Sequence, residues 1–218
     1  MAMSRRERLL STFSMQEPDC VPISPLFHVQ FPSKFLGIPL SDLASPLATY
    51  PVWKAELETF KKLGMDALVE GDHYDSNVQA KWPLPFLHQA AAYMRLPENV
   101  RIRVEATKEE TGRVWFKRDF ETPNGVLETT CVLPREDQAW EKKPLISDPE
   151  NDLEKLKCIL DGKITLAEYN KVREAVGEYG AVKMTTQFPL NFYVGYRDTT
   201  DRMGIVDLYV HPTLVKEY

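Results

Sequence analysis

Apolar residues recur along this chain at alternating helical and strand spacings. Ser4 and Glu7 have the three-residue spacing of a capping box, which predicts a helix that begins after Ser4 and is stopped by Pro18. Residues 21–23 (Val-Pro-Ile) are predicted to begin a buried strand. A short helix that seals one end of a sheet and then leads into its first strand is typical of a β/α barrel. The apolar face of this helix is predicted to contain Leu9, Leu10 and Phe13.

A second helix and strand follow a proline-rich stretch. Residues 27–46 have the composition of a loop, with a short helix predicted around Leu40–Ala44. Residues 46–63 have helical spacing, and Gly64 is predicted to end that helix. The apolar run MDALVEGDH then predicts a strand. Helix, glycine and buried strand together form the αβ joint of a βαβ unit. The apolar positions of the helix are Val52, Leu57, Phe60 and Leu63.

Residues 100–134 have a different pattern. Apolar and polar residues alternate in three runs, and the sequences KEETGR and TPNG between the runs have the composition of turns. This pattern predicts an antiparallel three-stranded meander with mixed faces. We expect it to be an insertion that decorates a parallel framework.

After the meander, helix and strand alternate again. An Asp-Pro-Glu sequence at 148–150 predicts a helix start, because proline fits the first turn and acids favour it. A helix over 166–179 that ends before a glycine, a strand within 181–192 and a helix over 199–209 follow. A last helix begins at His211, and the sequence ends about one turn later. We therefore expect this chain to be cut from a longer one.

Composition excludes several classes of function. The 218 residues carry a formal net charge of −5, whereas nucleic-acid surfaces are normally basic. No apolar run approaches the ~20 residues that span a bilayer, and the charged N-terminus is no signal peptide. The three cysteines are scattered and do not resemble a disulfide framework. These features predict a cytoplasmic protein.

Several segments resemble the uroporphyrinogen decarboxylase-like superfamily. They are SRRERLLSTFSMQEPDCVPISP at the start, DPENDLEKLKCIL at 148–160, and GAVKMTTQFPL followed by a helix and HPTLVKEY. The sequences ETPNGVLETT and WEKKPLISDPENDLEKLK are more similar to the methyltransferase branch, which transfers methyl groups between a corrinoid protein and acceptors such as coenzyme M or tetrahydrofolate.

The resemblance implies an α/β fold, a TIM-type (β/α)8 barrel. Such a barrel takes about 250 residues without insertions. Residues 1–218 would then be a single incomplete barrel domain, its N-terminal part, with the β-meander at 100–134 inserted in it. About half of the eight strands would be present.

Candidate site residues follow the predicted strands, because barrel sites lie at the carboxyl ends of strands. His28 follows the first strand and is a candidate for binding substrate. Glu70, Asp72 and His73 follow the second and are able to act as general acids or bases or as oxygen ligands. The resemblance places a catalytic aspartate near Asp72. The alternative is that Asp72 caps a turn and His73 is a solvated loop residue.

A third strand end carries polar residues that are candidates for binding substrate, and they are equally suited to satisfying loop backbone groups. They are Gln187, Asn191 and Tyr193.

Two departures from the resemblance bear on function. Decarboxylases of this superfamily carry a Met-Arg-Gln-Ala-Gly-Arg motif that binds substrate carboxylates. This chain has PLFHVQFPSKF there, with no arginine between Arg8 and Arg95. The methyltransferase branch binds zinc through His-x-Cys and a distant cysteine, and no histidine here has a cysteine two residues on. No metal ligand is therefore predicted in this chain, and corrinoid and zinc are implied only for a full-length relative.

Three functions stay open. The first is part of a corrinoid-dependent methyltransferase that acts on a small methylated substrate or a thiol or folate acceptor. The second is a decarboxylase of a tetrapyrrole or smaller carboxylate, in which Asp72 holds a pyrrole-type N–H. The third is a non-catalytic half-barrel that pairs through an open sheet edge. Expected partners are a small-molecule substrate, a corrinoid protein, and a second copy or a second barrel half.

Overall fold

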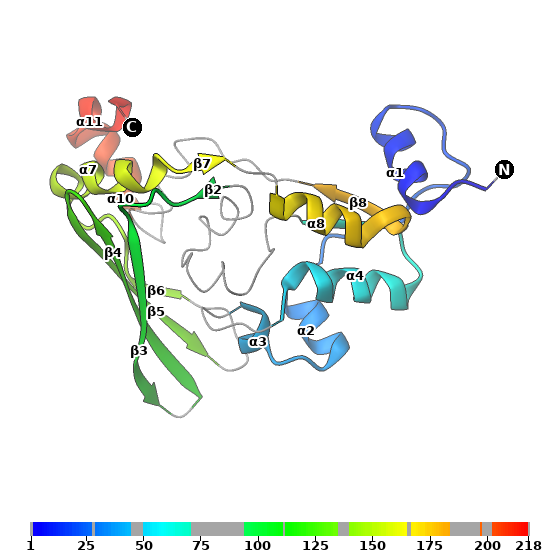
Figure 1. Ribbon diagram of the computed structural model, residues 1–218, viewed down its shortest axis with the longest axis horizontal. Coiled ribbons are helices and arrows are strands. Elements are labelled where there is room, and N and C mark those ends of the chain that lie inside the picture. Colours follow the sequence, from blue (N-terminus) through cyan, green and yellow to red (C-terminus); the bar gives the residue numbers. More distant parts are fainter. Residues whose placement is uncertain are drawn as a thin grey trace. The chain divides into compact units, whose positions relative to one another are not determined.

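The structure of this chain is a computed structural model that describes residues 2–27, 29–44, 50–70, 94–110, 112–134, 140–164, 167–183, 197 and 202–217. The chain divides into two units (Figure 1). The first unit is Met1–Trp82, His88–Tyr93 and Thr165–Thr185, and the second is Pro83–Leu87, Met94–Ile164 and Thr186–Tyr218. The prediction of a single barrel domain that carries the meander as an insertion stays a prediction.

The described elements of the first unit are mainly helical. They are α1 (Arg5–Phe13), α2 (Gln30–Leu36), α3 (Leu40–Ala44), α4 (Val52–Leu63), β1 (Ala67–Glu70), α8 (Ala167–Val176), the 3-10 helix η1 (Gly177–Tyr179) and β8 (Gly180–Lys183). Those of the second unit are β2 (Met94–Arg95), β3 (Arg101–Glu110), β4 (Arg113–Thr122), β5 (Gly125–Pro134), β6 (Trp140–Lys143), α7 (Pro149–Leu160), β7 (Lys163–Ile164), α10 (Arg202–Val210) and α11 (Pro212–Glu217).

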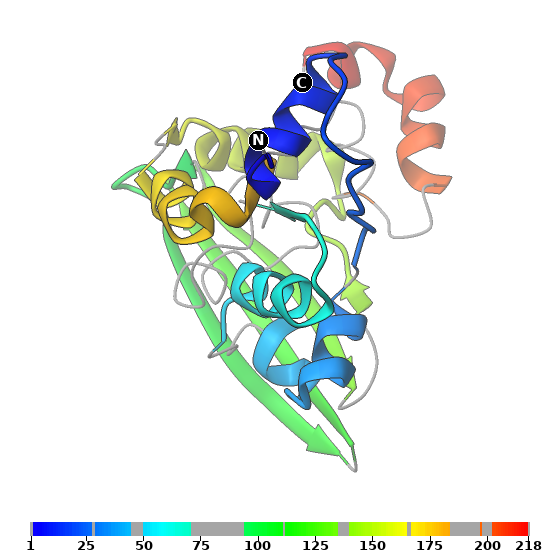
Figure 2. The ribbon, with the colours of Figure 1, turned by 90° about the vertical axis from the view of Figure 1, so that its right-hand side faces the viewer.

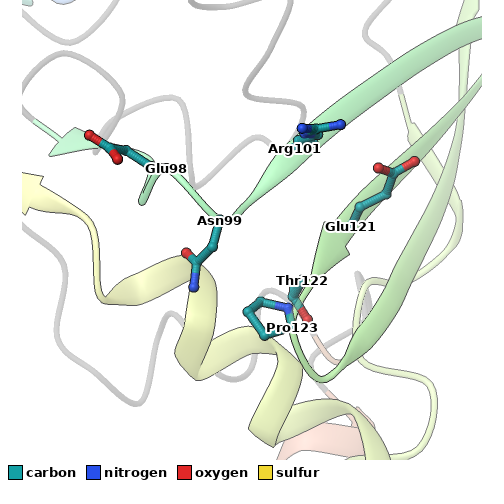
Figure 3. Close-up of a pocket in the computed structure, with 6 residues that line it drawn as sticks. All are labelled: Glu98, Asn99, Arg101, Glu121, Thr122 and Pro123. Carbon is teal, nitrogen blue, oxygen red and sulfur yellow. The ribbon is translucent and has the colours of Figure 1, made fainter.

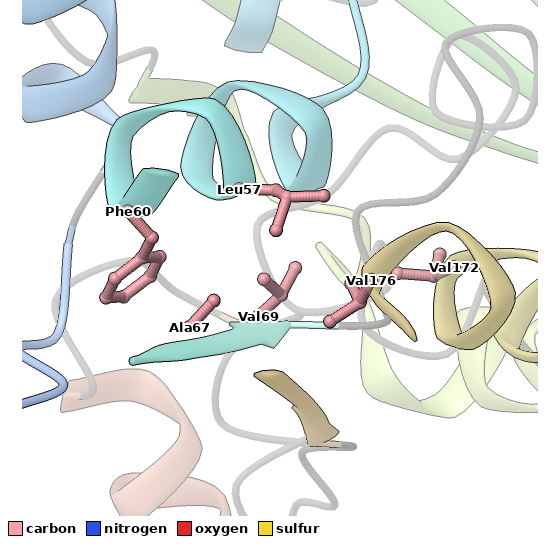
Figure 4. Close-up of a cluster of buried hydrophobic side chains, with 6 residues drawn as sticks. All are labelled: Leu57, Phe60, Ala67, Val69, Val172 and Val176. Atoms are coloured by element: carbon pink, nitrogen blue, oxygen red, sulfur yellow. The ribbon is translucent and has the colours of Figure 1, made fainter. Parts of the chain in front are cut away.

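Strands β1 and β8 form a parallel pair at the centre of the first unit. Their register runs from Ala67 opposite Gly180 to Glu70 opposite Lys183. Helices α4 and α8 contribute side chains to one core with β1 (Figure 4). Two helices on one side of a parallel pair form the local geometry of a β/α unit. The buried core residues are Leu57, Phe60, Ala67, Val69, Val172 and Val176.

Glycines shape the chain where it enters each strand of this pair. Gly64 caps α4 in the left-handed conformation at φ 70°, which confirms the predicted end of that helix, and β1 follows as predicted. The helix begins at Val52, later than predicted. At the other strand, a Cβ on Gly180 would overlap the carbonyl oxygen of Ala67 and lie 2.7 Å from its Cβ. Only glycine therefore allows β8 to approach β1 this closely.

Helix α1 seals the amino ends of these strands. The capping box is present: Ser4 Oγ accepts from Glu7 N at 3.2 Å, and Ser4 N donates to the Glu7 carboxylate at 2.7 Å. Arg5 donates to the carbonyl of Gly64 at 2.7 Å and stacks over the ring of Tyr179 at 4.7 Å. The helix therefore bridges the α4–β1 joint and the η1–β8 joint.

Three predictions about the opening residues are wrong. Helix α1 ends at Phe13, before Pro18 is reached. Of its predicted apolar face only Leu9 is buried, and Leu10 and Phe13 are exposed. Residues 21–23 form no strand, and Val21 and Ile23 are exposed rather than buried. The backbone at Ile23 is held by Asp66, through both the carboxylate and the backbone N–H of that residue.

That carboxylate is the centre of an ion cluster at the amino end of β1. The Asp66 side chain is buried, accepts from Arg8 Nη1 at 2.7 Å and Ile23 N at 2.9 Å, and lies 3.6 Å from Arg5. The Asp66 N–H in turn donates to the carbonyl of Ile23 at 3.0 Å. Arg8 Nε also donates to Asp19 at 2.7 Å. Helix α1, the segment that follows it and the start of β1 are thus tied to one carboxylate.

Part of the predicted loop at 27–46 is helical. Helix α3 is confirmed, but α2, which lies beside α4 (Figure 2), was not predicted. Pro32 lies in the first turn of α2, where its missing N–H has no intrahelical partner to lose, so it does not break the helix. Phe27 stacks on Phe31 at 4.7 Å and Phe31 on Phe35 at 5.8 Å, which adds ring contacts along the helix.

The second unit contains the predicted meander. Strands β3, β4 and β5 pair antiparallel in that order, which confirms the prediction, and β6 adds a fourth strand that was not predicted. Helix α7 contacts β4 and β5, and Asn124 in the β4–β5 turn donates to the carbonyl of Glu154 at 3.1 Å. The residues buried on one face include Phe116, Phe120, Leu127 and Cys131.

Helix α7 begins where the sequence predicts, whereas α10 is described from Arg202 rather than from residue 199. Asp148 caps α7 by accepting from Glu150 N, with Pro149 in the first position. Residues within 199–217 form α10 and α11, and His211 N donates to the carbonyl of Asp207 at 2.8 Å. Among the described residues, no helix has the length and apolar character needed to cross a bilayer.

Gly180→Ala is expected to destabilise the chain by ~3 kcal/mol, because the new methyl group has no room beside the backbone of Ala67. Gly112→Ala is the matched control. Its Cβ meets nothing within 4 Å, and at φ 76° it is expected to cost only about 1 kcal/mol. Urea unfolding of both variants measures the difference. Equal losses of stability would contradict the close approach of β8 to β1.

The ion cluster predicts a pH dependence. Hydrogen bonds from Arg8 and from the backbone of Met3 hold the pKa of the Asp19 carboxyl well below its usual range. Its stabilisation is therefore fully present above a pH of about 4 and is lost as pH falls through its folded pKa. The stability advantage of the wild type over Asp19→Asn should shrink as pH is lowered from about 6 to 3 in urea titrations. A stability difference that stays constant over this range would contradict the ion pair between Asp19 and Arg8.

Candidate functional site

The carboxyl ends of β1 and β8 share one edge of the sheet. Because the strands are parallel and in register, Glu70 ends one beside Lys183 at the end of the other. Two chain segments, one after each strand, therefore start from adjacent points. Ligands of open α/β sheets and of barrels bind at this end of the strands. This edge is the candidate functional site.

The two faces of the strand pair have different surroundings. Ala67 and Val69 are buried against α4 and α8, and Val182 packs against the same cluster. Strand residues alternate between faces, so Leu68, Ala181 and Lys183 belong to the other face, and all three are half-buried. In a closed β/α barrel the face away from the helices is the barrel interior. Lys183 therefore lies at the carboxyl edge, on the face away from the helices.

The structure describes only one of the residues predicted for the site. Glu70 is the last residue of β1, and its backbone pairs with that of Lys183. In the sequence, Asp72 and His73 come two and three residues later. The remaining predicted residues lie outside the described residues, so the structure does not test whether they meet. They are His28, Asp72, His73, Gln187, Asn191 and Tyr193.

Lys183 is a candidate that the sequence analysis missed. It pairs in register with Glu70 and is half-buried. A lysine at a substrate pocket is able to bind a carboxylate or phosphate as a point charge. The signal was present in the sequence: the run AVKM places one lysine at the end of an otherwise apolar strand. Only the pairing with β1 shows that Lys183 lies at the same edge of the sheet as Glu70, after which other predicted site residues follow in the sequence.

A polar concavity lies in the second unit, away in the sequence from the edge formed by β1 and β8 (Figure 3). It has a volume of about 300 Å³ and is formed by the turn before β3 and the β4–β5 turn. Two of its lining residues, Glu121 and Thr122, also make hydrogen bonds within the sheet. Glu121 accepts from Arg103 at 3.3 Å, and Thr122 Oγ1 donates to the carbonyl of Gly125 at 2.7 Å. The lining residues are Glu98, Asn99, Arg101, Glu121, Thr122 and Pro123, and Glu70, the one described residue of the predicted site, is not among them.

The described residues do not fit a zinc site. Within them, no group of three or more histidines, cysteines, aspartates or glutamates is arranged to hold a metal ion. Cys20 is exposed, Cys131 is buried within the four-stranded sheet, and Cys158 Sγ donates to the carbonyl of Glu154 on α7. His211 Nδ1 lies 3.7 Å from the carboxylate of Glu150, which accounts for its position structurally. The three cysteines form no disulfide.

Comparison of this chain with protein-family models, with curated proteins and with solved structures finds no match. The family and the barrel fold predicted from the sequence therefore stay predictions. Support for a site comes from the chain itself: the shared carboxyl edge of β1 and β8, and the polar residues that follow both strands in the sequence.

Proposed function

We propose that this chain is part of a uroporphyrinogen decarboxylase-like (β/α)8 barrel that takes part in corrinoid-dependent methyl transfer in the cytoplasm. The parallel register of β1 and β8, with α4 and α8 packed on one side, is the observation that carries the proposal. It supports a β/α framework whose next strands would extend the same sheet. The antiparallel β3–β5 meander supports the methyltransferase branch, because the resembling sequence ETPNGVLETT spans its β4–β5 turn.

The proposed chemistry assigns roles to residues at the carboxyl edge. When a methyl group leaves a heteroatom of the substrate, that atom keeps the bonding electron pair and needs a proton. Asp72 or His73 would supply it as general acid, with Glu70 beside them. His28, Gln187, Asn191 and Tyr193 would bind the substrate through hydrogen bonds. The corrinoid would enter as the co-substrate of a partner protein and accept the methyl group.

One observation favours decarboxylation as a second candidate. A decarboxylase needs a cation beside the substrate carboxylate. Residues 9–94 contain no arginine that would supply this cation, so it must come from another residue. Lys183 offers a positive charge at the carboxyl edge, in register with Glu70. In that case Lys183 would bind a carboxylate, and Asp72 would hold a pyrrole-type N–H.

Asp72→Asn is expected to lower methyl transfer about 10²–10⁴-fold, the range of general acid catalysis, and to leave corrinoid binding unchanged. The assay follows transfer of the methyl group of methyl-coenzyme M or methyltetrahydrofolate to cob(I)alamin, with corrinoid binding measured by absorbance titration. The matched control is Asp161→Asn at the exposed end of α7, which should keep both activities.

Titration with uroporphyrinogen separates the two candidates. If uroporphyrinogen binds and methylcobalamin does not, methyl transfer is wrong, and Lys183→Met should then weaken binding while Lys183→Arg retains it. If neither ligand binds, both enzyme proposals are wrong and the non-catalytic function is favoured. If Asp72→Asn transfers methyl groups as fast as the wild type, Asp72 is not the general acid.

A further inference from the structure

Helix α10 exposes most of its apolar side chains. Six of its nine residues are large, apolar and exposed, and they lie around the helix away from Gly204 and Asp207, which are buried. A helix that is apolar nearly all round is normally covered by other protein. The exposed fractions are Met203 41%, Ile205 53%, Val206 44%, Leu208 39%, Tyr209 85% and Val210 61%.

The opposite side of α10 is fixed by a buried ion pair. Arg197 Nε donates to Asp207 Oδ2 at 2.7 Å, and both side chains are nearly buried. Arg197 Nη1 also donates to the carbonyls of Ile146 and Ser147, at 3.2 and 3.0 Å. The pair therefore anchors α10 to the loop before α7. It also turns the one carboxylate of this helix away from the apolar face.

We propose that the apolar face of α10 binds the same face of a second copy of this chain, as an antiparallel pair of helices about a twofold axis. In such a contact each residue near the axis meets its own copy, so a charge there would repel itself. The face from Met203 to Val210 carries no charge, because Asp207 is held inward by Arg197. This proposal is independent of the reaction proposed above.

The exposed area suits a dimer. At roughly 150–250 Å² for a large side chain, the exposed fractions amount to on the order of 600 Å², against ~800 Å² for each partner of a standard interface. Helix α11 contacts α10, and its first residues, Pro212 and Thr213, are uncharged and exposed. They would extend the same contact beyond the end of α10.

A membrane surface fits this helix less well than a second copy. Helices that lie on membranes combine an apolar face with a polar face rich in lysine and arginine. The side of α10 opposite its apolar face carries Gly204 and Asp207, which are buried in the second unit. Among the described side chains of α10, Met203 to Val210, none is a lysine or an arginine, so they offer no basic face to lipid headgroups.

Light scattering after size-exclusion chromatography, over a range of protein concentrations, tests the proposal. The full chain is expected to dimerise, and both Val206→Glu and Val206→Arg, at the middle of the face and so nearest the axis, should weaken dimerisation on the order of 100-fold or more, because a charge would be buried beside its own copy. Mixing the two variants should restore a dimer, since opposite charges then meet across the axis. Phe13→Glu on α1, where the wild-type side chain is 59% exposed, is the matched control and should dimerise normally.

Several results would overturn the proposal. A wild-type chain that is monomeric at every concentration excludes the dimer. Dimers that persist in both Val206 variants, or that are lost in Phe13→Glu instead, place the contact elsewhere. Failure of the mixed variants to pair excludes the twofold arrangement. Far-ultraviolet circular dichroism of each variant confirms that loss of the dimer is not loss of the fold.

Discussion

The buried carboxylate of Asp66 is the interaction on which the first unit depends. A carboxylate removed from water must be paired, and Asp66 is paired with Arg8 and with the backbone N–H of Ile23. These partners come from α1 and from the segment that follows it, whereas Asp66 immediately precedes β1. Removing one partner of a buried ion pair costs about 3–5 kcal/mol, a large part of the stability of a domain. The position of β1 therefore depends on residues at the start of the chain.

The two ends of the strand pair carry different kinds of residues. The amino end carries the ion cluster of Asp66, together with Arg5 over Tyr179, and the partners there satisfy one another. The carboxyl end brings Glu70 beside Lys183, and polar residues follow both strands in the sequence. In β/α barrels the amino face serves stability and the carboxyl face serves catalysis. Asp66 and Lys183 lie at opposite ends of the strand pair, which agrees with that division. The carboxyl end is therefore the place to look for a site.

Local chemistry made parts of this fold predictable. The capping box at Ser4, the glycine after α4 and the Asp-Pro pair before α7 each fix a helix end through their own backbone, so neighbouring residues suffice to identify them. The meander was predictable because its turns and alternation are also local. The exposure of residues 21–23 was not predictable from local sequence, because it depends on whether other parts of the chain cover Val21 and Ile23. Strand β6 was missed for the same reason, since its partner β5 defines it.

The candidate site was predictable only in part, for a related physical reason. Strand-end position can be inferred from one segment at a time, which identified Glu70 and the residues after it. The importance of Lys183 depends on register, a property of two strands more than 100 residues apart in sequence. The same holds for Arg197 and Asp207, whose pairing gives α10 an uncharged face. In both units a buried Asp–Arg pair fixes a helix, but its consequence differs. At Asp66 the pair joins segments within the first unit. At Asp207 it holds the carboxylate of α10 away from the exposed side chains, and the proposed contact between two copies rests on that.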